Sequence, residues 1–126
     1  LDCEKVWLLK PFTRGNKIDD LFNNLGRYFP VVDRLENGVI TSVKSVDMSL
    51  KTYQNERKLL STLKGYVIAL DNAETYAAVR KLNYSGKELL LAIPDIELAD
   101  AQINALNSLY AYAAEKNIAV SIAIIK

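Results

Sequence analysis

Residues 30–45 read PVVDRLENGVITSVKS. Two runs rich in β-branched residues, 28–35 and 39–46, flank Glu36-Asn37-Gly38, and an Asn-Gly pair is the strongest short signal for a tight hairpin turn. This stretch therefore predicts two antiparallel strands joined by a tight turn.

The same hairpin carries a compact set of polar side chains. Side chains alternate across a strand, so Ser42 and Lys44 share one face, and Asp33 on the adjoining strand lies within pairing distance of them. One reading is a cross-strand ion pair between Asp33 and Lys44, worth under about 1 kcal/mol. The other reading is a catalytic patch that combines an acid, a hydroxyl and an ammonium group. The residue types alone favour the ion pair and leave both readings open.

The rest of the chain alternates between helical and strand patterns. Helical spacing with an Asn16 cap predicts a helix at 16–25, and a longer helix is expected from a Ser49 cap to residue 72, interrupted or bent near Gly65. The order α-β-β-α-β-α-β predicts an α/β fold, a single domain with a mixed central sheet flanked by helices. The later elements are a mixed segment at 74–86, a buried strand at 87–93 ended by Pro94, a helix at 98–113 and a central strand at 118–125.

Composition narrows the chemistry available to the chain. Its 126 residues are half apolar and one quarter charged, which fits one globular domain. No apolar stretch reaches the roughly 20 residues that span a bilayer, so we expect no stable membrane association. The single cysteine, Cys3, allows no intramolecular disulfide, and the absence of histidine excludes Ser-His-Asp triads, Cys-His pairs and histidine-ligated zinc. An enzyme with this composition works with carboxylates, lysine, tyrosine or a metal held by oxygen.

The charges are unevenly distributed. Residues 1–64 contain eleven Lys and Arg against eight acids, a balance of +3, whereas residues 65–126 contain five against seven, a balance of −2. The first half is therefore the better candidate to bind an anionic partner, although ordinary surface scatter explains such an asymmetry equally well.

Several short strings together resemble a known family. The string 29–33 (FPVVD), the Asn37-Gly38 turn, 41–47 (TSVKSVD) and 51–54 (KTYQ) are similar to the C-terminal nuclease toxins of contact-dependent growth inhibition, the CdiA and MafB type in the PD-(D/E)xK superfamily. The resemblance runs from about residue 15 to the final strand. It implies a restriction-endonuclease-like fold and divides the chain into a lead-in segment at 1–14 and a nuclease toxin domain at 15–126.

The resemblance also assigns roles to individual residues. Asp33 matches the first acid of the motif and Lys44 its lysine, while Ser42 stands where the middle acid would be. The helix acid of the superfamily falls on Asp19, with Asp20 as the alternative. The implied site contains Asp19, Asp33, Ser42 and Lys44, with a divalent cation (zinc, magnesium or manganese) held by Asp19 and Asp33.

Substrate and partners follow from the same resemblance. Lys51, Thr52 and Gln54 open the helix after the lysine strand and would contact substrate phosphate, although exposed polar residues on a helix are nearly as good an explanation. The substrate would be DNA, slightly favoured, or tRNA. The domain would be delivered as part of a larger secreted or cell-surface protein, act in the cytoplasm of a competing bacterium and be neutralised by a cognate immunity protein. The alternative is a non-catalytic α/β binding or immunity domain.

Overall fold

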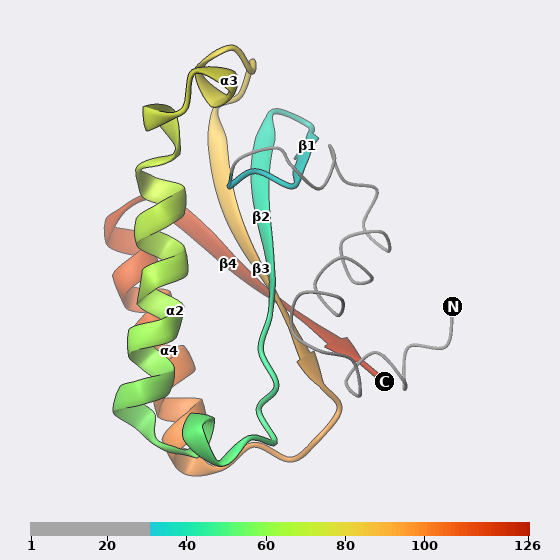
Figure 1. Ribbon diagram of the computed structural model, residues 1–126, viewed down its shortest axis with the longest axis vertical. Helices are drawn as coiled ribbons and strands as arrows, with labels where there is room; N and C mark the ends of the chain where they lie inside the picture. Colours follow the sequence, from blue (N-terminus) through green and yellow to red (C-terminus); the bar gives the residue numbers. More distant parts are fainter. Residues whose placement is uncertain (1–30) are drawn as a thin grey trace.

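The computed structural model describes residues 31–126, so the expected lead-in at 1–14 and the expected helix at 16–25 lie outside the described part of the chain. Within it, four strands form one mixed sheet in the order β1-β2-β3-β4, with β1 antiparallel to β2 and the other neighbours parallel (Figure 1). The predicted α/β fold with a mixed sheet is confirmed. Its elements are β1 (Arg34–Glu36), β2 (Val39–Ser45), η2 (Lys51–Gln54), α2 (Glu56–Asp71), η3 (Ala73–Thr75), α3 (Ala77–Arg80), β3 (Gly86–Pro94), α4 (Asp100–Glu115) and β4 (Ile118–Ile125).

The predicted hairpin is present, with a shorter first strand than expected. Asn37 and Gly38 have φ angles of 52° and 76°, the left-handed pair that a two-residue hairpin turn requires. Residues 31–33 were expected in the strand, but β1 begins only at Arg34. Two features end the pairing there: Val31 has a φ of 63°, and the side chain of Asp33 accepts a hydrogen bond from the backbone N–H of Val43.

The long helix after the hairpin begins later than predicted. Asn55, and not Ser49, caps α2, because its side chain accepts a 3.0 Å hydrogen bond from a backbone N–H of the first turn. The interruption expected near Gly65 is also wrong, since α2 runs through that residue. A helical glycine weakens a helix by about 1 kcal/mol, and the burial of Leu63 and Val67 on the inner face of α2 offsets that loss.

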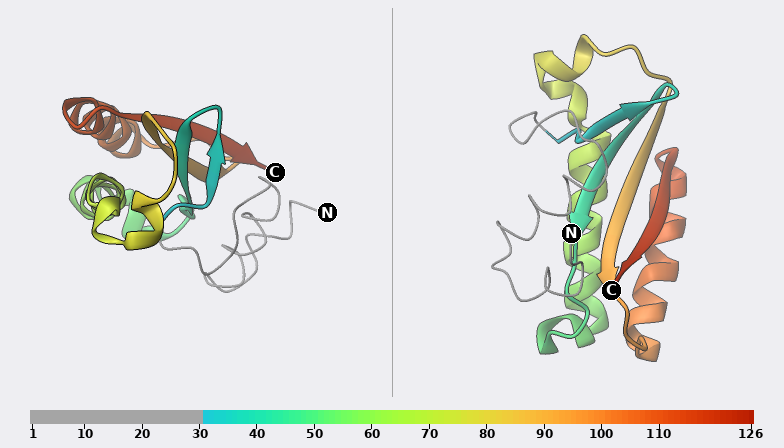
Figure 2. Two further views of the ribbon diagram at one scale, coloured as in Figure 1. Left: turned by 90° about the horizontal axis from the view of Figure 1, so that it is seen from above. Right: turned by 90° about the vertical axis from the view of Figure 1, so that its right-hand side faces the viewer.

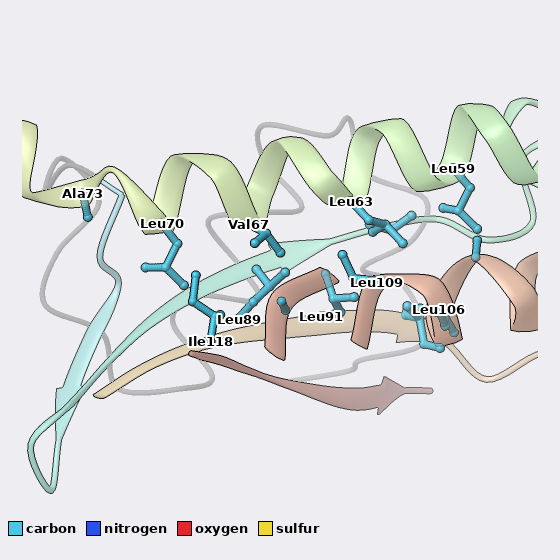
Figure 3. Close-up of a cluster of buried hydrophobic side chains, with 14 of the residues drawn as sticks. Leu59, Leu63, Val67, Leu70, Ala73, Leu89, Leu91, Leu106, Leu109 and Ile118 are labelled. Atoms are coloured by element: carbon cyan, nitrogen blue, oxygen red, sulfur yellow. The ribbon is translucent and has the colours of Figure 1, made fainter. Parts of the chain in front are cut away.

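Helices α2 and α4 cover the same face of the sheet, as Figure 1 and the left view of Figure 2 show. The side chains between them and the sheet are aliphatic and fully or almost fully buried, and each such leucine contributes roughly 1.5–3 kcal/mol. None of the helices in the described part of the chain is long and apolar enough to cross a membrane. Figure 3 shows ten of the core residues: Leu59, Leu63, Val67, Leu70, Ala73, Leu89, Leu91, Leu106, Leu109 and Ile118.

The last strand lies where the sequence did not predict it. Its apolar residues on both faces favoured a central position, but β4 pairs only with β3 and is an edge of the sheet formed by the described residues. The central strands are β2 and β3. Most of β4 is only partly buried, and Ile124 is 59% exposed, so the apolar residues of this strand indicate neither two covered faces nor a second neighbouring strand.

Candidate active site

The hairpin brings the predicted site residues Asp33, Ser42 and Lys44 close to one another. Asp33 directly precedes β1, and its hydrogen bonds to the backbone of Thr41 and Val43 hold it beside this part of β2. In β2, Ile40 packs in the main core under the helices, and alternation places Ser42 and Lys44 on that same face.

Asp33 is fixed at the end of β1 by two backbone hydrogen bonds. Its N–H donates to the carbonyl of Thr41 at 2.8 Å, and its Oδ2 accepts from the N–H of Val43 at 2.6 Å. Burial raises the pKa of the Asp33 carboxyl above its ordinary value, while the bond from Val43 and the positive charge of Lys44 act in the opposite direction. The carboxyl is therefore held in place and partly desolvated. A nearby cation stabilises its charged form more strongly in such surroundings than in bulk water.

Lys44 lies between this carboxyl and helix α2. Its ammonium nitrogen is 5.6 Å from the centre of the Tyr66 ring, which projects from α2. Lys44 and Asp33 are close enough for the lysine to lower the pKa of the acid, but they form no direct ion pair. The simple cross-strand ion pair expected from the sequence is therefore absent.

Ser42 presents an unusual hydroxyl beside Asp33. Ser42 is 1% exposed, and its Oγ has no hydrogen-bond partner in the described part of the chain. A buried hydroxyl without a partner costs roughly 1–3 kcal/mol, so native structures rarely keep one without a reason. An oxygen ligand completed by a bound cation or water is one such reason.

The three residues expected to bind substrate lie elsewhere. Lys51, Thr52 and Gln54 form the exposed turn η2 and line an open depression of about 470 Å³ together with Asn55 and Lys58. Because α2 rises about 1.5 Å per residue, this depression lies about 15 Å along the helix from Tyr66. The structure therefore does not bring these residues into contact with Asp33 and Lys44.

The remaining predicted ligands belong to the N-terminal part of the chain. Asp19 and its alternative Asp20 lie outside the described residues. Within residues 31–126, no three acidic or cysteine side chains gather in a way that could hold a metal ion. In this part of the chain, the predicted oxygen donors on the hairpin are those of Asp33 and Ser42.

Sequence reasoning missed a polar network on the opposite face of the sheet. The Glu88 carboxylate accepts hydrogen bonds from Arg34 Nη2 (3.2 Å), Thr41 Oγ1 (3.2 Å) and Ser121 Oγ (2.7 Å), and these partners come from β1, β2 and β4. Glu88 thus ties the short edge strand β1 to the centre of the sheet. A charged residue within the otherwise apolar run 88–93 was the available signal, because such a charge needs partners.

Sequence reasoning also missed Tyr66. This residue lies beside the buried positions of α2 and does not belong to its apolar repeat, so periodicity does not single it out. Only the packing of α2 over β2 shows that its ring meets Lys44.

Comparisons with known proteins agree with this architecture. The family model for the CDI toxin restriction endonuclease-like domain matches residues 14–123. No curated protein matches the chain. Among solved structures, the CdiA-CT/CdiI toxin and immunity complex from Yersinia pseudotuberculosis contains a similar chain, with 16% identity and a TM-score of 0.63 over 94% of this chain and 100% of that one. At this identity the likeness shows a shared fold.

Proposed function

Because the chain belongs to the family of CDI toxin restriction endonuclease-like domains, we propose that it is a nuclease toxin whose catalytic site contains Asp33, Ser42 and Lys44. The proposed reaction is hydrolysis of a phosphodiester bond in nucleic acid. The observation that carries the assignment is the unpartnered, buried Ser42 hydroxyl beside the desolvated Asp33 carboxyl, with the Lys44 ammonium close by but not paired to it.

The oxygen donors of this patch fit a divalent cation. Carboxylate and hydroxyl oxygens suit magnesium or manganese, and zinc also accepts carboxylate ligands. Asp33 and Ser42 would hold the ion, with Asp19 or Asp20 as a further proposed ligand. When bound, such an ion polarises the phosphate and makes a nearby water more acidic.

In the proposed mechanism, the side chains of the site orient the attacking water and stabilise the charge on the phosphate. Lys44 places a positive charge where the negative charge of the attacked phosphate increases, and this preorganised charge stabilises the transition state. Asp33 is anchored through Oδ2 to Val43, which leaves Oδ1 to accept from an attacking water. Burial of Ser42 beneath α2 limits access of bulk water to this corner.

The basic turn before α2 is the proposed path for the substrate backbone. Lys51 and Lys58 line the depression with Thr52 and Gln54, all of them exposed, and they lie at the positive end of a 16-residue helix. A separation of about 15 Å corresponds to about four nucleotides of one duplex strand, at about 3.4 Å per step. Such a path suits a polymeric substrate, with DNA slightly favoured over tRNA.

We further propose a cognate immunity protein as the partner. The similar solved chain belongs to a CdiA-CT/CdiI toxin and immunity complex, which supports the same kind of partner here. The partner would present an acidic surface to the face that accepts phosphates. The association rate would then fall as ionic strength rises, and a rate independent of salt would exclude an electrostatic interface.

The same proposal gives the domain boundaries and the compartment in which the domain would act. Residues 15–126 would be the toxin domain and residues 1–14 a lead-in from a larger protein that is secreted or displayed on the cell surface. The domain would then act in the cytoplasm of the target cell.

Nuclease activity is tested directly with purified protein. Plasmid DNA and total tRNA are incubated separately with the chain in magnesium, manganese or zinc, each with and without excess chelator. We expect cleavage of one substrate that requires the cation and stops with chelator. Intact substrates in every metal would contradict the nuclease and favour a non-catalytic binding domain.

A further inference from the structure

Tyr66 faces the proposed catalytic lysine from the opposite layer of the fold. Its ring projects from α2, whereas Lys44 projects from β2, and the 5.6 Å between ammonium nitrogen and ring centre is within the range of a cation–π contact. Both residues are half-buried, so the attraction is less screened than on an open surface.

The lysine needs such a restraint. A lysine ammonium is a compact charge on a flexible four-carbon stem, and its rotamers are held only where neighbours hold them. Within residues 31–126, the Lys44 ammonium forms no ion pair, and the Asp33 carboxyl influences it without direct contact. The contact that fixes the ammonium on the α2 side is therefore the face of the Tyr66 ring.

We infer that Tyr66 is a positioning residue that holds the Lys44 ammonium beside the Asp33 carboxyl, a role that rests on the proposed nuclease function. The ring does not touch the reacting atoms. Its electron-rich face attracts the ammonium without neutralising its charge, whereas a carboxylate at the same place would pair with the lysine and weaken its action on phosphate. The face of the ring, and not the hydroxyl, is what this role requires.

The chain provides a matched control for this inference. Tyr112 on α4 is also half-buried against the main core, and its ring contacts Lys64 at 4.9 Å and Lys116 at 5.3 Å. These lysines belong to helix surfaces and not to the hairpin. Replacing Tyr112 with Leu therefore removes a similar ring and a similar cation–π contact without touching the proposed site.

Steady-state cleavage kinetics of Tyr66→Leu, Tyr66→Phe and Tyr112→Leu test the role, with thermal unfolding to confirm folding. We expect Tyr66→Leu to lower kcat about tenfold, the equivalent of about 1.4 kcal/mol, with KM within about twofold. Tyr66→Phe should restore most of the rate, and Tyr112→Leu should retain it. Equal rates for all three variants and the wild-type protein, or no rescue by Phe, would overturn the positioning role.

A spectroscopic measurement separates this inference from the nuclease proposal. The side-chain methylene protons next to the Lys44 ammonium should show an upfield ring-current shift that Tyr66→Leu removes and Tyr66→Phe retains. Absence of that shift would refute the contact itself. A wild-type protein that shows the shift but cleaves nothing would refute the nuclease, and with it any role of Tyr66 in catalysis.

Discussion

The substitution Asp33→Asn removes the charge of the proposed catalytic acid but keeps its size and its hydrogen bond from Val43 N–H. Burial raises the pKa of Asp33 above 3.8, so the native state binds this proton more tightly than the unfolded state does. The contribution of the carboxyl to stability is therefore fully present below about pH 3.8 and is lost as pH rises through the raised native pKa. At neutral pH, this effect of burial on its own favours Asp33→Asn over the wild-type protein.

The expected magnitude follows from two opposing effects. Each unit by which burial raises the pKa costs about 1.4 kcal/mol at neutral pH, reduced by solvent screening because Asp33 is only half-buried. A neutral acceptor makes a weaker bond to Val43, by about 1 kcal/mol. We therefore expect the two proteins to lie within about 1 kcal/mol of each other at pH 7, with the variant gaining relative to the wild type between pH 4 and pH 7.

A divalent cation should separate the two proteins clearly. At a hundred times its dissociation constant, a bound ion adds about 2.7 kcal/mol to the stability of the native state. For a domain of this size, that is roughly a 10 °C rise in Tm. The wild-type protein should show this rise and Asp33→Asn should not.

The assay is thermal unfolding followed by circular dichroism from pH 4 to pH 7, with and without magnesium or manganese. Asp95→Asn, which neutralises an exposed carboxylate, serves as the control and should respond to the cation as the wild type does. A loss of more than about 3 kcal/mol in Asp33→Asn at pH 7 would refute this reasoning, because it would mean that the carboxylate is a stabilising partner in a buried charge pair.

Three further variants test separate parts of the structure. Ser42→Ala removes a buried hydroxyl without a partner, so it should leave the unfolding free energy unchanged or raise it by up to about 1 kcal/mol in urea titration, while cleavage falls at least tenfold. Glu88→Gln weakens the network that ties Arg34 and β1 to the sheet and should lower the unfolding free energy by about 1–2 kcal/mol; an unchanged midpoint would show that the network does not stabilise β1. Lys51→Ala combined with Lys58→Ala should raise KM with little change in kcat and should flatten the salt dependence of substrate binding by about 1.4–1.8 in log–log slope; an unchanged slope would remove η2 from the substrate path.

Much of the described fold was predictable because its signals are local. The Asn37-Gly38 turn, the apolar repeat of α2 and the β-branched run of β4 each act over a few residues, and each element is present. The wrong predictions concern contacts between segments, which local sequence patterns do not determine. The cap of α2 depends on which nearby side chain reaches the free N–H groups, and the edge position of β4 depends on which strands pair.

The proximity of three of the predicted site residues was also readable from the sequence. Strand alternation puts Ser42 and Lys44 on one face of β2, and the tight turn brings Asp33 beside this strand; both features are readable from the sequence. Membership of the toxin family was predicted and is confirmed. The roles of the three residues stay predictions. The neighbours Tyr66 and Glu88 were not predictable, because helix packing over the sheet and long-range strand order bring them to their partners.

Single-turnover cleavage by Lys44→Ala, compared with Lys64→Ala, tests the central claim most directly. Both variants remove a lysine ammonium that contacts a tyrosine ring, at 5.6 Å and 4.9 Å, so they differ mainly in whether the lysine lies on the hairpin. Loss of the charge that stabilises the transition state should lower the rate of Lys44→Ala about 100- to 1,000-fold, while Lys64→Ala cleaves as the wild-type protein does. A folded Lys44→Ala protein that cleaves at the rate of Lys64→Ala would contradict the assignment of the active site.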